Sequence, residues 1–425
     1  MSQGIRDRAV EIRRTFHRYP EPSWREFLTT SRLVDELEAL DVDELHVGSD
    51  VLVSESRMSV PEEADLDHWF EKARENGARE DVLEKTKGGH TGVVAVVEKG
   101  DGPVLGLRVD IDALPQPEST DESHYPVQEG FRSENENAMH ACGHDSHMTM
   151  GLGTIEAIQQ SDFSGTLKVF FQPAEEVLGG GKSMADSPLI EDVEGLLAVH
   201  IGLGHPSGEI VAGSVKPLSV QKSTVRFTGE PAHAGLAPNE GRNVMQAAAA
   251  AIQNLYAIPR HADGMTRVNV GKAKIGEASN IIPDHGELQI EVRAETNDLR
   301  DYMQEKAERT IRAAAEMHDV EVDIEMVSRA PRVDSDETSI DAVATAAKET
   351  DGVTSVLRTG NFGASEDATY LMRAVQENGG VAGFPIVGTD HPGGHHTATF
   401  DVNEDDIFVG IDVLSGALLE LERRV

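Results

Sequence analysis

Side chains that bind metal ions lie close together in the segment 139–148, whose sequence is MHACGHDSHM. Within it, Cys142 and His144 flank a single glycine. Because residues two apart do not share a helix face, a loop is needed to turn both side chains the same way. Thiolate and imidazole are ligands of zinc and related ions. A buried, inert cysteine is the alternative for Cys142, but its position between histidines favours a metal ligand.

A pair of carboxylates, Glu175 and Glu176, follows the apolar run 167–171 and a proline. Adjacent carboxylates at a strand end project to different sides. One can therefore bind a metal ion while the other accepts a proton from a water as a general base. A Glu-Glu pair is usually just solvated, but its position after a buried strand favours a functional role.

Further histidines stand where strands or loops are expected to end. His200 ends the apolar run 195–199 and, taken alone, is better interpreted as a core residue. His395 and His396 follow paired glycines in a loop before Phe400, a setting common at metal sites. Together, one thiolate, several imidazoles and a carboxylate suffice for a site in which two metal ions share a water.

The chain is strongly acidic, with 75 Asp and Glu against 38 Lys and Arg, a net charge of −37. This balance argues against binding nucleic acid through a basic face and against docking on an anionic membrane. It suits solubility in concentrated salt, which screens self-repulsion. We therefore expect a protein from a high-salt cytoplasm, with an ordinary acidic enzyme as the alternative.

Other features also favour a cytoplasmic protein. No apolar run reaches the length of a membrane span, and the charged N-terminal segment is unlike a signal peptide. Cys142 is the only cysteine in a chain of 425 residues, which excludes an intrachain disulfide and suits a reducing compartment.

The elements that must position these side chains alternate between helix and strand, which indicates a layered α/β domain. We expect strands at 91–97, 104–109, 167–171, 196–199 and 381–387, and helices at 5–18, 28–40, after 145, after 180, near 341, from 366 and at 404–422. The charge-rich stretch 54–87 has a helical middle and is expected to be a solvated surface insert.

The middle of the chain has its own complete pattern. Strands at 222–228, 267–275, 287–294 and 320–326 and helices at 239–256 and 297–317, the second capped by Asn297, follow in the order β-α-β-β-α-β. This order is the split, ferredoxin-like arrangement. We therefore expect an inserted domain at 217–330 between the two parts of the catalytic domain, 1–216 and 331–425.

Motifs along nearly the whole chain resemble those of the aminoacylase-like dinuclear metallopeptidases, in the branch of N-acyl-amino-acid amidohydrolases. In chain order they are HACGHD, FQPAEE, AVHIG, AHAG, ASNIIPD and GHHTATFDV. The segments ESRMSVPEE, GGHTGVVAVV and SEDAT are similar to the subgroup of p-aminobenzoyl-glutamate hydrolase and the indole-3-acetyl-aspartate hydrolases. The resemblance implies a phosphorylase/hydrolase-like α/β catalytic domain with a ferredoxin-like dimerisation, or lid, domain.

The resemblance also implies roles for individual positions. Glu175 matches the general base, and the matching metal ligands are Cys142, His144, Glu176, His200 and His396. His396 is preferred to His395 because Phe400 lies four residues beyond it, although Ala398 replaces the family's proline.

Further positions match residues that support the metals or reach the substrate. Asp110 matches an acid that supports the metal site, and Arg108 stands where other branches place a ligand histidine. His233, Asn280 and Arg293 match substrate-binding residues of the inserted domain, with His233 also acting in catalysis across a dimer interface. The alternative for Arg293 is a place on the polar face of its strand.

By resemblance, the chain cleaves the amide of N-acyl or N-aroyl amino acids, such as p-aminobenzoyl-glutamate or indole-3-acetyl-aspartate. A dipeptidase or carboxypeptidase with the same machinery, or a non-catalytic partner of a related chain, are the alternatives; the filled ligand and base positions favour an enzyme. Two divalent ions per chain are implied: the thiolate and imidazoles favour Zn²⁺, whereas the subgroup implies Mn²⁺. A homodimer, or a heterodimer with a related subunit, is expected.

Overall fold

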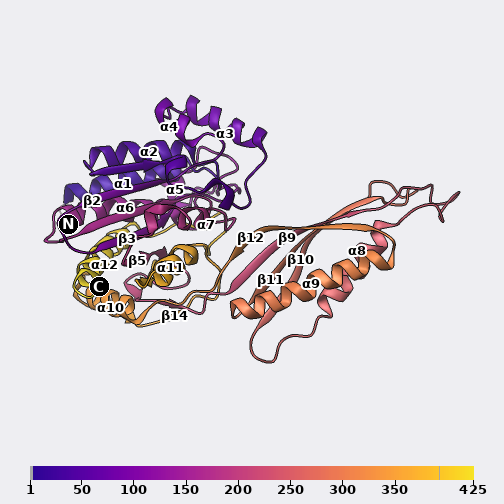
Figure 1. Cartoon of the computed structure of the whole chain (residues 1–425). Coiled ribbons are helices and arrows are strands. Elements are labelled where there is room, and N and C mark those ends of the chain that lie inside the picture. Colours follow the sequence, from indigo (N-terminus) through magenta and orange to yellow (C-terminus); the bar gives the residue numbers. More distant parts are fainter. Residues whose placement is uncertain (1–2, 392) are drawn as a thin grey trace. The chain divides into compact units, whose positions relative to one another are not determined.

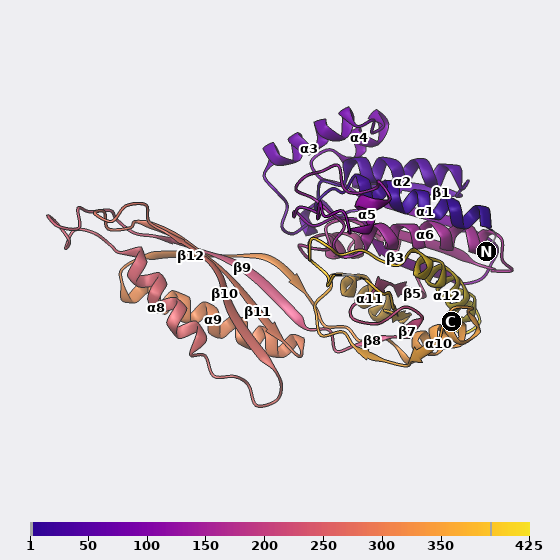
Figure 2. The same cartoon turned by 180° about the vertical axis from the view of Figure 1, so that it is seen from behind.

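A computed structural model describes residues 3–391 and 393–425, and the chain divides into two compact units, which Figures 1 and 2 show from opposite sides. The first unit comprises the residues up to Val215 together with Val333–Phe362 and Glu366–Val425, and the second comprises Lys216–Arg332 and Gly363–Ser365. The short segment joins the second unit because Ser365 Oγ donates to the Leu218 carbonyl at 2.6 Å. The sequence expectation, with boundaries after 216 and 330, had left this segment in the catalytic domain.

The first unit is built on a mixed six-stranded sheet. Its strands, in spatial order, are β1 (Glu44–Val47), β2 (Val93–Glu98), β4 (Thr166–Gln172), β3 (Val104–Asp110), β5 (Gly195–Ala198) and β15 (Val381–Gly383). The strands from β4 to β15 are parallel, and β2 and β1 add an antiparallel edge. The carboxyl ends of β3, β4 and β5 therefore meet at one edge of the sheet.

Helices cover this sheet on both faces, which explains why its strands are nearly continuous apolar runs. Alternate strand residues such as Val169 and Phe171 share one core with α1 (Gln3–Arg18), α2 (Phe27–Ala39), α6 (His144–Gln159), α10 (Glu337–Glu349) and α12 (Glu404–Glu422). The intervening residues, such as Phe170, are also buried, and α7 (Gly180–Ala185) and α11 (Ala368–Glu377) contact the sheet there. Among the described residues, no helix is long and apolar enough to span a membrane.

Small sheets lie beside this layer. One has the order β13 (Ser355–Leu357), β7 (Glu209–Val211), β16 (Ile386–Val387) and β6 (His200–Ile201), and the other pairs β14 (Gly360–Asn361) with β8 (Ser214–Val215). The single strand expected at 381–387 is wrong, since it divides into β15 and β16 in different sheets. Pro385 lies between them, lacks a backbone N–H, and accepts the His200 N–H at 3.2 Å.

The charge-rich insert is more firmly packed than expected. It holds η2 (Ser54–Ser56), α3 (Glu63–Glu75) and α4 (Glu80–Thr86) and follows η1 (Gly48–Asp50). Leu66, Val82 and Leu83 are buried, and α3 and α4 both contact α2. The prediction of a solvated surface element is therefore wrong for one side of each helix, where apolar side chains at helical spacing form a core. The short α5 (Tyr125–Gln128) and η3 (Pro188–Ile190) complete this unit.

The second unit has the predicted order: β9 (Ser219–Thr228), α8 (Val244–Tyr256), β10 (Thr266–Ile275), β11 (His285–Ala294), α9 (Asn297–Met317) and β12 (Glu321–Ala330). Its antiparallel sheet has the spatial order β10-β11-β9-β12, and α8 and α9 share a core with one face of it (Figure 1). The predicted fold class, an α/β domain with an inserted ferredoxin-like α+β domain, is confirmed.

In this unit, one helix start and one helix cap differ from the sequence expectation. Helix α8 begins at Val244 rather than 239, because Arg242 forms a β-bridge with Glu230 and Asn243 caps the helix. Helix α9 is capped by Thr296, whose side chain accepts from Leu299 N at 3.2 Å. The predicted cap, Asn297, instead accepts from Ser219 Oγ at 2.9 Å.

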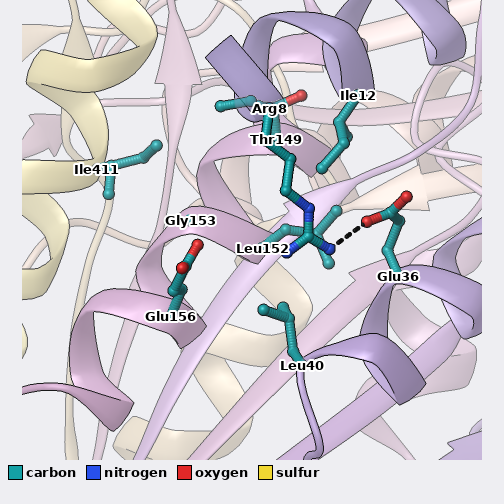
Figure 3. A pocket seen from close by; sticks show the side chains of 10 residues that line it. Arg8, Ile12, Glu36, Leu40, Thr149, Leu152, Gly153, Glu156 and Ile411 are labelled. Atoms are coloured by element: carbon teal, nitrogen blue, oxygen red, sulfur yellow. Dashed lines mark hydrogen bonds and ion pairs between the residues drawn. The ribbon is translucent and has the colours of Figure 1, made fainter. Parts of the chain in front are cut away.

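A cavity between α1, α2, α6 and α12 is too small for a substrate. Its volume is about 20 Å³, enough for a single water. Arg8 and Glu36 form an ion pair of 2.7 Å in its wall, with Glu156 close by (Figure 3). None of its lining residues belongs to the site that the sequence predicted.

Candidate active site

The cysteine and histidine of the first motif are placed by a left-handed glycine. Gly143 has φ +88° and precedes α6, which begins at His144. A Cβ at Gly143 would lie 2.5 Å from Ile201 Cγ2, so a larger residue would clash as well as strain the backbone. The expected turn around this glycine is therefore present, and Cys142 and His144 both point into the same buried cluster.

The predicted ligand residues converge in that cluster. Their donor atoms fall into overlapping groups within 4.8 Å, namely Cys142, His144 and His200; Cys142, Glu176 and His396; and His144, Glu175 and Glu176. Cys142 Sγ lies 3.5 Å from His200 Nε2, and His396 Nε2 lies 3.5 Å from Glu176 Oε2. These residues are far apart in the chain: Cys142 and His144 come from the turn into the start of α6, Glu175 and Glu176 from the turn after β4, His200 from the start of β6, and His396 from the 393–400 loop.

A strained turn carries the paired glutamates. Ala174 and Leu178, neither of them glycine, have φ of +56° and +55°. The turn is closed by hydrogen bonds from Gly179 N to the Ala174 carbonyl at 2.8 Å and from Leu178 N to the Glu175 carbonyl at 2.7 Å. It sends the adjacent carboxylates to different partners. Glu176 lies between His144 and His396, whereas the Glu175 side chain hydrogen-bonds Glu366.

The adjacent histidines of the closing motif also separate. His395 Nε2 donates to the Ile201 carbonyl at 3.1 Å, which turns its ring away from Glu176. His396 has φ +62° and its backbone N–H donates to the Ala141 carbonyl at 2.8 Å, while its side chain reaches Glu176. The geometry therefore brings His396, and not His395, to the carboxylate.

Buried hydrogen bonds hold His144 and Asp110 in place. His144 Nδ1 donates to the Asp112 carbonyl at 2.8 Å, which leaves its Nε2 without a hydrogen-bond partner, 3.6 Å from Asp110 Oδ1. The other Asp110 oxygen accepts from Arg108 at 2.7 Å. Asp112 Oδ2 accepts the backbone N–H of Glu176 at 3.1 Å. Asp112 therefore contacts both His144 of the HACGHD motif and Glu176 of the FQPAEE motif.

The buried carboxyl groups of the cluster repel one another, and bound cations would stabilise their charged forms. Burial, with repulsion from Glu366 and Glu176, raises the pKa of Glu175 well above its usual range. Burial, with repulsion from Asp112 and Glu366, raises the pKa of Glu176 to about 8, although His144 opposes the shift. Such crowding of buried acids is costly unless cations neutralise them.

The donor set fits divalent metal ions. His144 Nε2 and Glu176 Oε1 are buried and have no hydrogen-bond partner, which leaves both free to coordinate. Burial and the neighbouring His147 and His395 lower the pKa of His200 well below its usual range, so its imidazole is neutral, as a metal ligand must be. A thiolate, imidazoles and a carboxylate are together suited to zinc or a similar ion.

The substrate-contacting candidates lie in the second unit. The backbone N–H of Ala234 donates to the Asn280 carbonyl at 3.0 Å, and His233 forms a β-bridge with Ile281, so His233 and Asn280 stand on adjoining loops. Arg293 is elsewhere, on β11, where Nε pairs with Glu291 at 2.6 Å. It lies on the polar side of its strand, a position that both the substrate-binding role and its alternative allow.

Several residues of the cluster had not been singled out. Glu366 Oε1 lies 3.9 Å from His200 Nε2, and it precedes α11 rather than starting it as predicted. Asp112 also contacts the predicted ligand His144. His147, which belongs to the metal-binding side chains predicted in the segment 139–148 but was given no role of its own, contacts His200. The only available signals were the acid pair in SEDAT, the second acid of RVDID and the last histidine of MHACGHDSHM.

Comparison with known proteins identifies the family. The model of peptidase family M20/M25/M40 matches residues 106–420, well over half of the chain. The chain belongs to this family. A Haemophilus influenzae homolog of one of the subunits of p-aminobenzoyl-glutamate hydrolase is 39% identical over 97% of this chain and 98% of its own length.

Other similar proteins cover the chain as fully. The indole-3-acetyl-aspartic acid hydrolase of Enterobacter agglomerans is 38% identical over 96% of this chain and 94% of its own. The crystal structure of an aminobenzoyl-glutamate utilization protein from Klebsiella pneumoniae superposes with a TM-score of 0.84 at 32% identity, over 98% of this chain and 96% of that one. The sequence-based recognition of this family and subgroup is confirmed.

Proposed function

We propose that this chain is a metal-dependent amidohydrolase that cleaves the amide bond of N-acyl or N-aroyl amino acids, with p-aminobenzoyl-glutamate and indole-3-acetyl-aspartate as model substrates. The observation that carries the proposal is the convergence of a cysteine sulfur, imidazoles and carboxylates, all largely buried except His396, with orphaned donor atoms at His144 and Glu176. The names of the full-length relatives point to the same reaction on amides of acidic amino acids.

We propose that Cys142, His144, Glu176, His200 and His396 hold two divalent ions, because their donor atoms form overlapping groups around shared members. Bound by these residues, such ions would polarise the scissile carbonyl and lower the pKa of the attacking water. The thiolate and imidazoles favour Zn²⁺, while the subgroup resemblance favours Mn²⁺.

Glu175 is the residue we assign to proton transfer. It is buried and hydrogen-bonded to Glu366, and its carboxylate lies within 4.8 Å of the donor atoms of His144 and Glu176, close to the proposed ligands. In the forward reaction it accepts a proton from the attacking water, and it then donates that proton to the nitrogen of the departing amine. Asp110 supports this centre through His147 and Arg108.

Substrate contacts come from the inserted domain. We assign His233 of a partner subunit to the oxyanion, where an imidazole N–H can donate a hydrogen bond. Asn280 stands beside it, and Arg293 is assigned to the carboxylate of the substrate. Because Glu291 holds the Arg293 guanidinium at 2.6 Å, substrate must share or displace this ion pair.

The setting of the enzyme is part of the proposal. The net charge of −37 supports a high-salt interior, and a chain with one cysteine suits the cytoplasm. We propose a dimer formed through the ferredoxin-like domain. Relatives that are named as one subunit of a hydrolase support a related chain, rather than a second copy, as the partner.

An activity panel tests this function against its rivals. The purified chain, loaded with Mn²⁺ or Zn²⁺, is assayed alone on p-aminobenzoyl-glutamate, indole-3-acetyl-aspartate, N-acetyl amino acids and dipeptides. We expect hydrolysis of the aroyl and acyl amino acids. Faster cleavage of dipeptides would establish the peptidase, and no turnover on any of them until a related chain is added would establish a dependent subunit.

A further inference from the structure

The N-terminal motif PEPSWRE, residues 20–26, lies against the turn that carries the paired glutamates. Ser23 Oγ donates to Asp112 Oδ2 at 2.6 Å, and the same oxygen accepts the Glu176 N–H at 3.1 Å. Trp24 Nε1 donates to the Met58 carbonyl at 2.8 Å. Met58 N in turn donates to the Gly179 carbonyl at 3.2 Å, at the end of the turn. Nothing in the proposed mechanism uses this motif.

Glu26 makes the most direct contact with that turn. Its side chain is fully buried, and Oε1 accepts the backbone N–H of Ala174 at 2.9 Å across 148 residues of sequence. The other oxygen, Oε2, accepts from Thr91 Oγ1 at 2.6 Å, which fixes the orientation of the carboxyl group. Both oxygens of the Glu26 carboxyl group are therefore held by hydrogen bonds, one to Ala174 and one to Thr91.

The residue held by Glu26 has an unfavourable backbone conformation. Ala174 has φ +56°, in the left-handed region, where a residue with a Cβ is strained. Such a conformation persists only where surrounding contacts determine it. Since Glu175 follows directly, rotation of the Ala174 backbone would swing the Glu175 carboxylate away from its place.

We propose that Glu26 is a positioning residue, which holds Ala174 in its left-handed conformation and thereby aims Glu175 at the reacting water. The proposal rests on the proposed function for the role of Glu175, and on the Glu26–Ala174 hydrogen bond for the geometry. Among the described residues, the Glu26 side chain hydrogen-bonds to Thr91 and to the Ala174 backbone and to no predicted metal ligand, so we expect it to act through the turn.

Glu21 provides a matched control within the same motif. It is also buried, and its oxygens accept from Leu28 N, Thr29 N and Thr29 Oγ1 at 3.1, 2.8 and 2.9 Å. These contacts stabilise the first turn of α2 and do not involve the 173–179 turn. A purely structural need for buried glutamates in this motif would affect Glu21 and Glu26 alike.

The chemistry of Glu26 also defines a conservative variant. Burial, with repulsion from Asp112, raises the pKa of Glu26 to about 8. A neutral glutamine of the same shape retains the oxygen that accepts from Ala174, while its amide can donate to Thr91. Leucine has a similar volume and no acceptor.

The test compares E26Q, E26L and E21L by kcat, KM, bound metal and a crystal structure of each variant. We expect E26Q to stay within about threefold of the wild-type kcat, and E26L to lose about 10- to 100-fold in kcat with KM and metal content little changed. In E26L the Ala174 φ should leave the left-handed region. E21L should lower the melting temperature but leave kcat close to wild type.

Other outcomes would overturn the proposal. Wild-type kcat in E26L, or equal losses in E26L and E21L, would show that the Ala174 contact does not position the base. If E26L does not fold, E26D replaces it, because a carboxyl one methylene shorter cannot reach Ala174 in the same way; undiminished kcat in E26D would then contradict the proposal. If the wild-type chain hydrolyses none of the amides, the proposed function is wrong. The backbone conformation of Ala174 in the variant structures still tests whether Glu26 holds it in the left-handed region.

Discussion

The Nδ1 atom of His147 lies 2.5 Å from Oδ1 of Asp110. Because His147 Nε2 accepts the backbone N–H of Ile201 at 2.9 Å, the ring proton must be on Nδ1 and His147 must be the donor to Asp110. His147 thus links the end of β3 to β6, whose first residue, His200, has its ring 4.7 Å from that of His147. His147 therefore holds Asp110, which supports the metal site, and packs beside His200, a predicted metal ligand.

Replacing His147 should therefore weaken metal binding. Residues that orient metal ligands typically contribute 10- to 100-fold in metal affinity, and we expect a loss of about that size in H147A. Titration calorimetry of the metal-free protein with Zn²⁺ or Mn²⁺ measures it. Half-buried His46, which pairs with Glu44 far from the cluster in sequence, provides the control H46A. Equal affinity in H147A and wild type would contradict the assigned role.

Glu175 and Glu176 should separate chemistry from metal binding. We expect E175Q to lower kcat by about 10²- to 10⁴-fold while it retains bound metal, because a glutamine cannot accept the proton. In contrast, E176Q should lose metal, since its oxygens lie 3.9 Å from His144 Nε2 and 3.5 Å from His396 Nε2. Elemental analysis after gel filtration, together with initial rates, distinguishes these effects. Near-wild-type turnover in E175Q would refute its role as the base.

Removing divalent ions should lower both activity and stability. Without them the buried carboxylates of Glu175, Glu176 and Glu366 face one another with raised pKa values. We expect dialysis against a chelator to abolish turnover and to lower the melting temperature, and added Mn²⁺ or Zn²⁺ to restore both, because a ligand that binds only the folded state stabilises it. The variant C142A should respond less to added metal. An unchanged melting temperature after complete metal removal would count against the site.

Stability should fall at alkaline pH because of His17. This buried imidazole lies 2.8 Å from Asp145 and 3.0 Å from Glu118. Burial and Arg13 oppose its charge, but the two carboxylates prevail and raise the pKa of His17 to about 9. The folded state therefore binds this proton more tightly than the unfolded state. The resulting stabilisation is complete below pH 6.5 and is lost as pH rises through about 9.

Denaturant unfolding between pH 6 and 10 measures this effect, which should be on the order of 3 kcal/mol for a shift of this size. The variant H17Q should lose the His17 part of the pH dependence. Identical pH profiles for H17Q and wild type would exclude the His17 contribution.

Glu118 should affect stability in the opposite direction, at acidic pH. Burial opposes its charge, but its hydrogen bonds to His17, Ser133 and His124 outweigh burial and lower its pKa to about 2. The stabilisation that Glu118 contributes is present above about pH 4.5 and is lost as pH falls towards 2.

Salt should stabilise the chain. With a net charge of −37, self-repulsion is large in dilute buffer and is screened within about 10 Å at 0.1 M salt and about 3 Å at 1 M. We expect the melting temperature and the turnover rate both to rise as KCl increases from 0.1 to 2 M, as a thermal-shift series and initial rates would show. A melting temperature that falls over this range would contradict the proposed high-salt setting.

The parts of the site that lie close together in the sequence could be predicted from neighbouring residue types. Cys142 and His144 stand on either side of a glycine, and the paired glutamates follow a strand, so their neighbours in sequence indicated both a turn and a chemistry. Apolar runs and helical spacing likewise predicted most elements, including α12 at its observed bounds, Glu404–Glu422. These signals depend on residues a few positions apart, whose geometry is set by backbone conformation alone.

The roles of Glu366 and Glu26 depended on tertiary structure. Each contacts the 173–179 turn from a distant segment, and the residues around each acid in the sequence do not indicate which distant residue it will contact. The division of the 381–387 run into strands of different sheets had the same cause, because Pro385 and His200 meet only in the folded chain. The residue types of this site were thus present in the sequence. Their pairing came from parallel strands that bring distant carboxyl ends to one edge of a sheet.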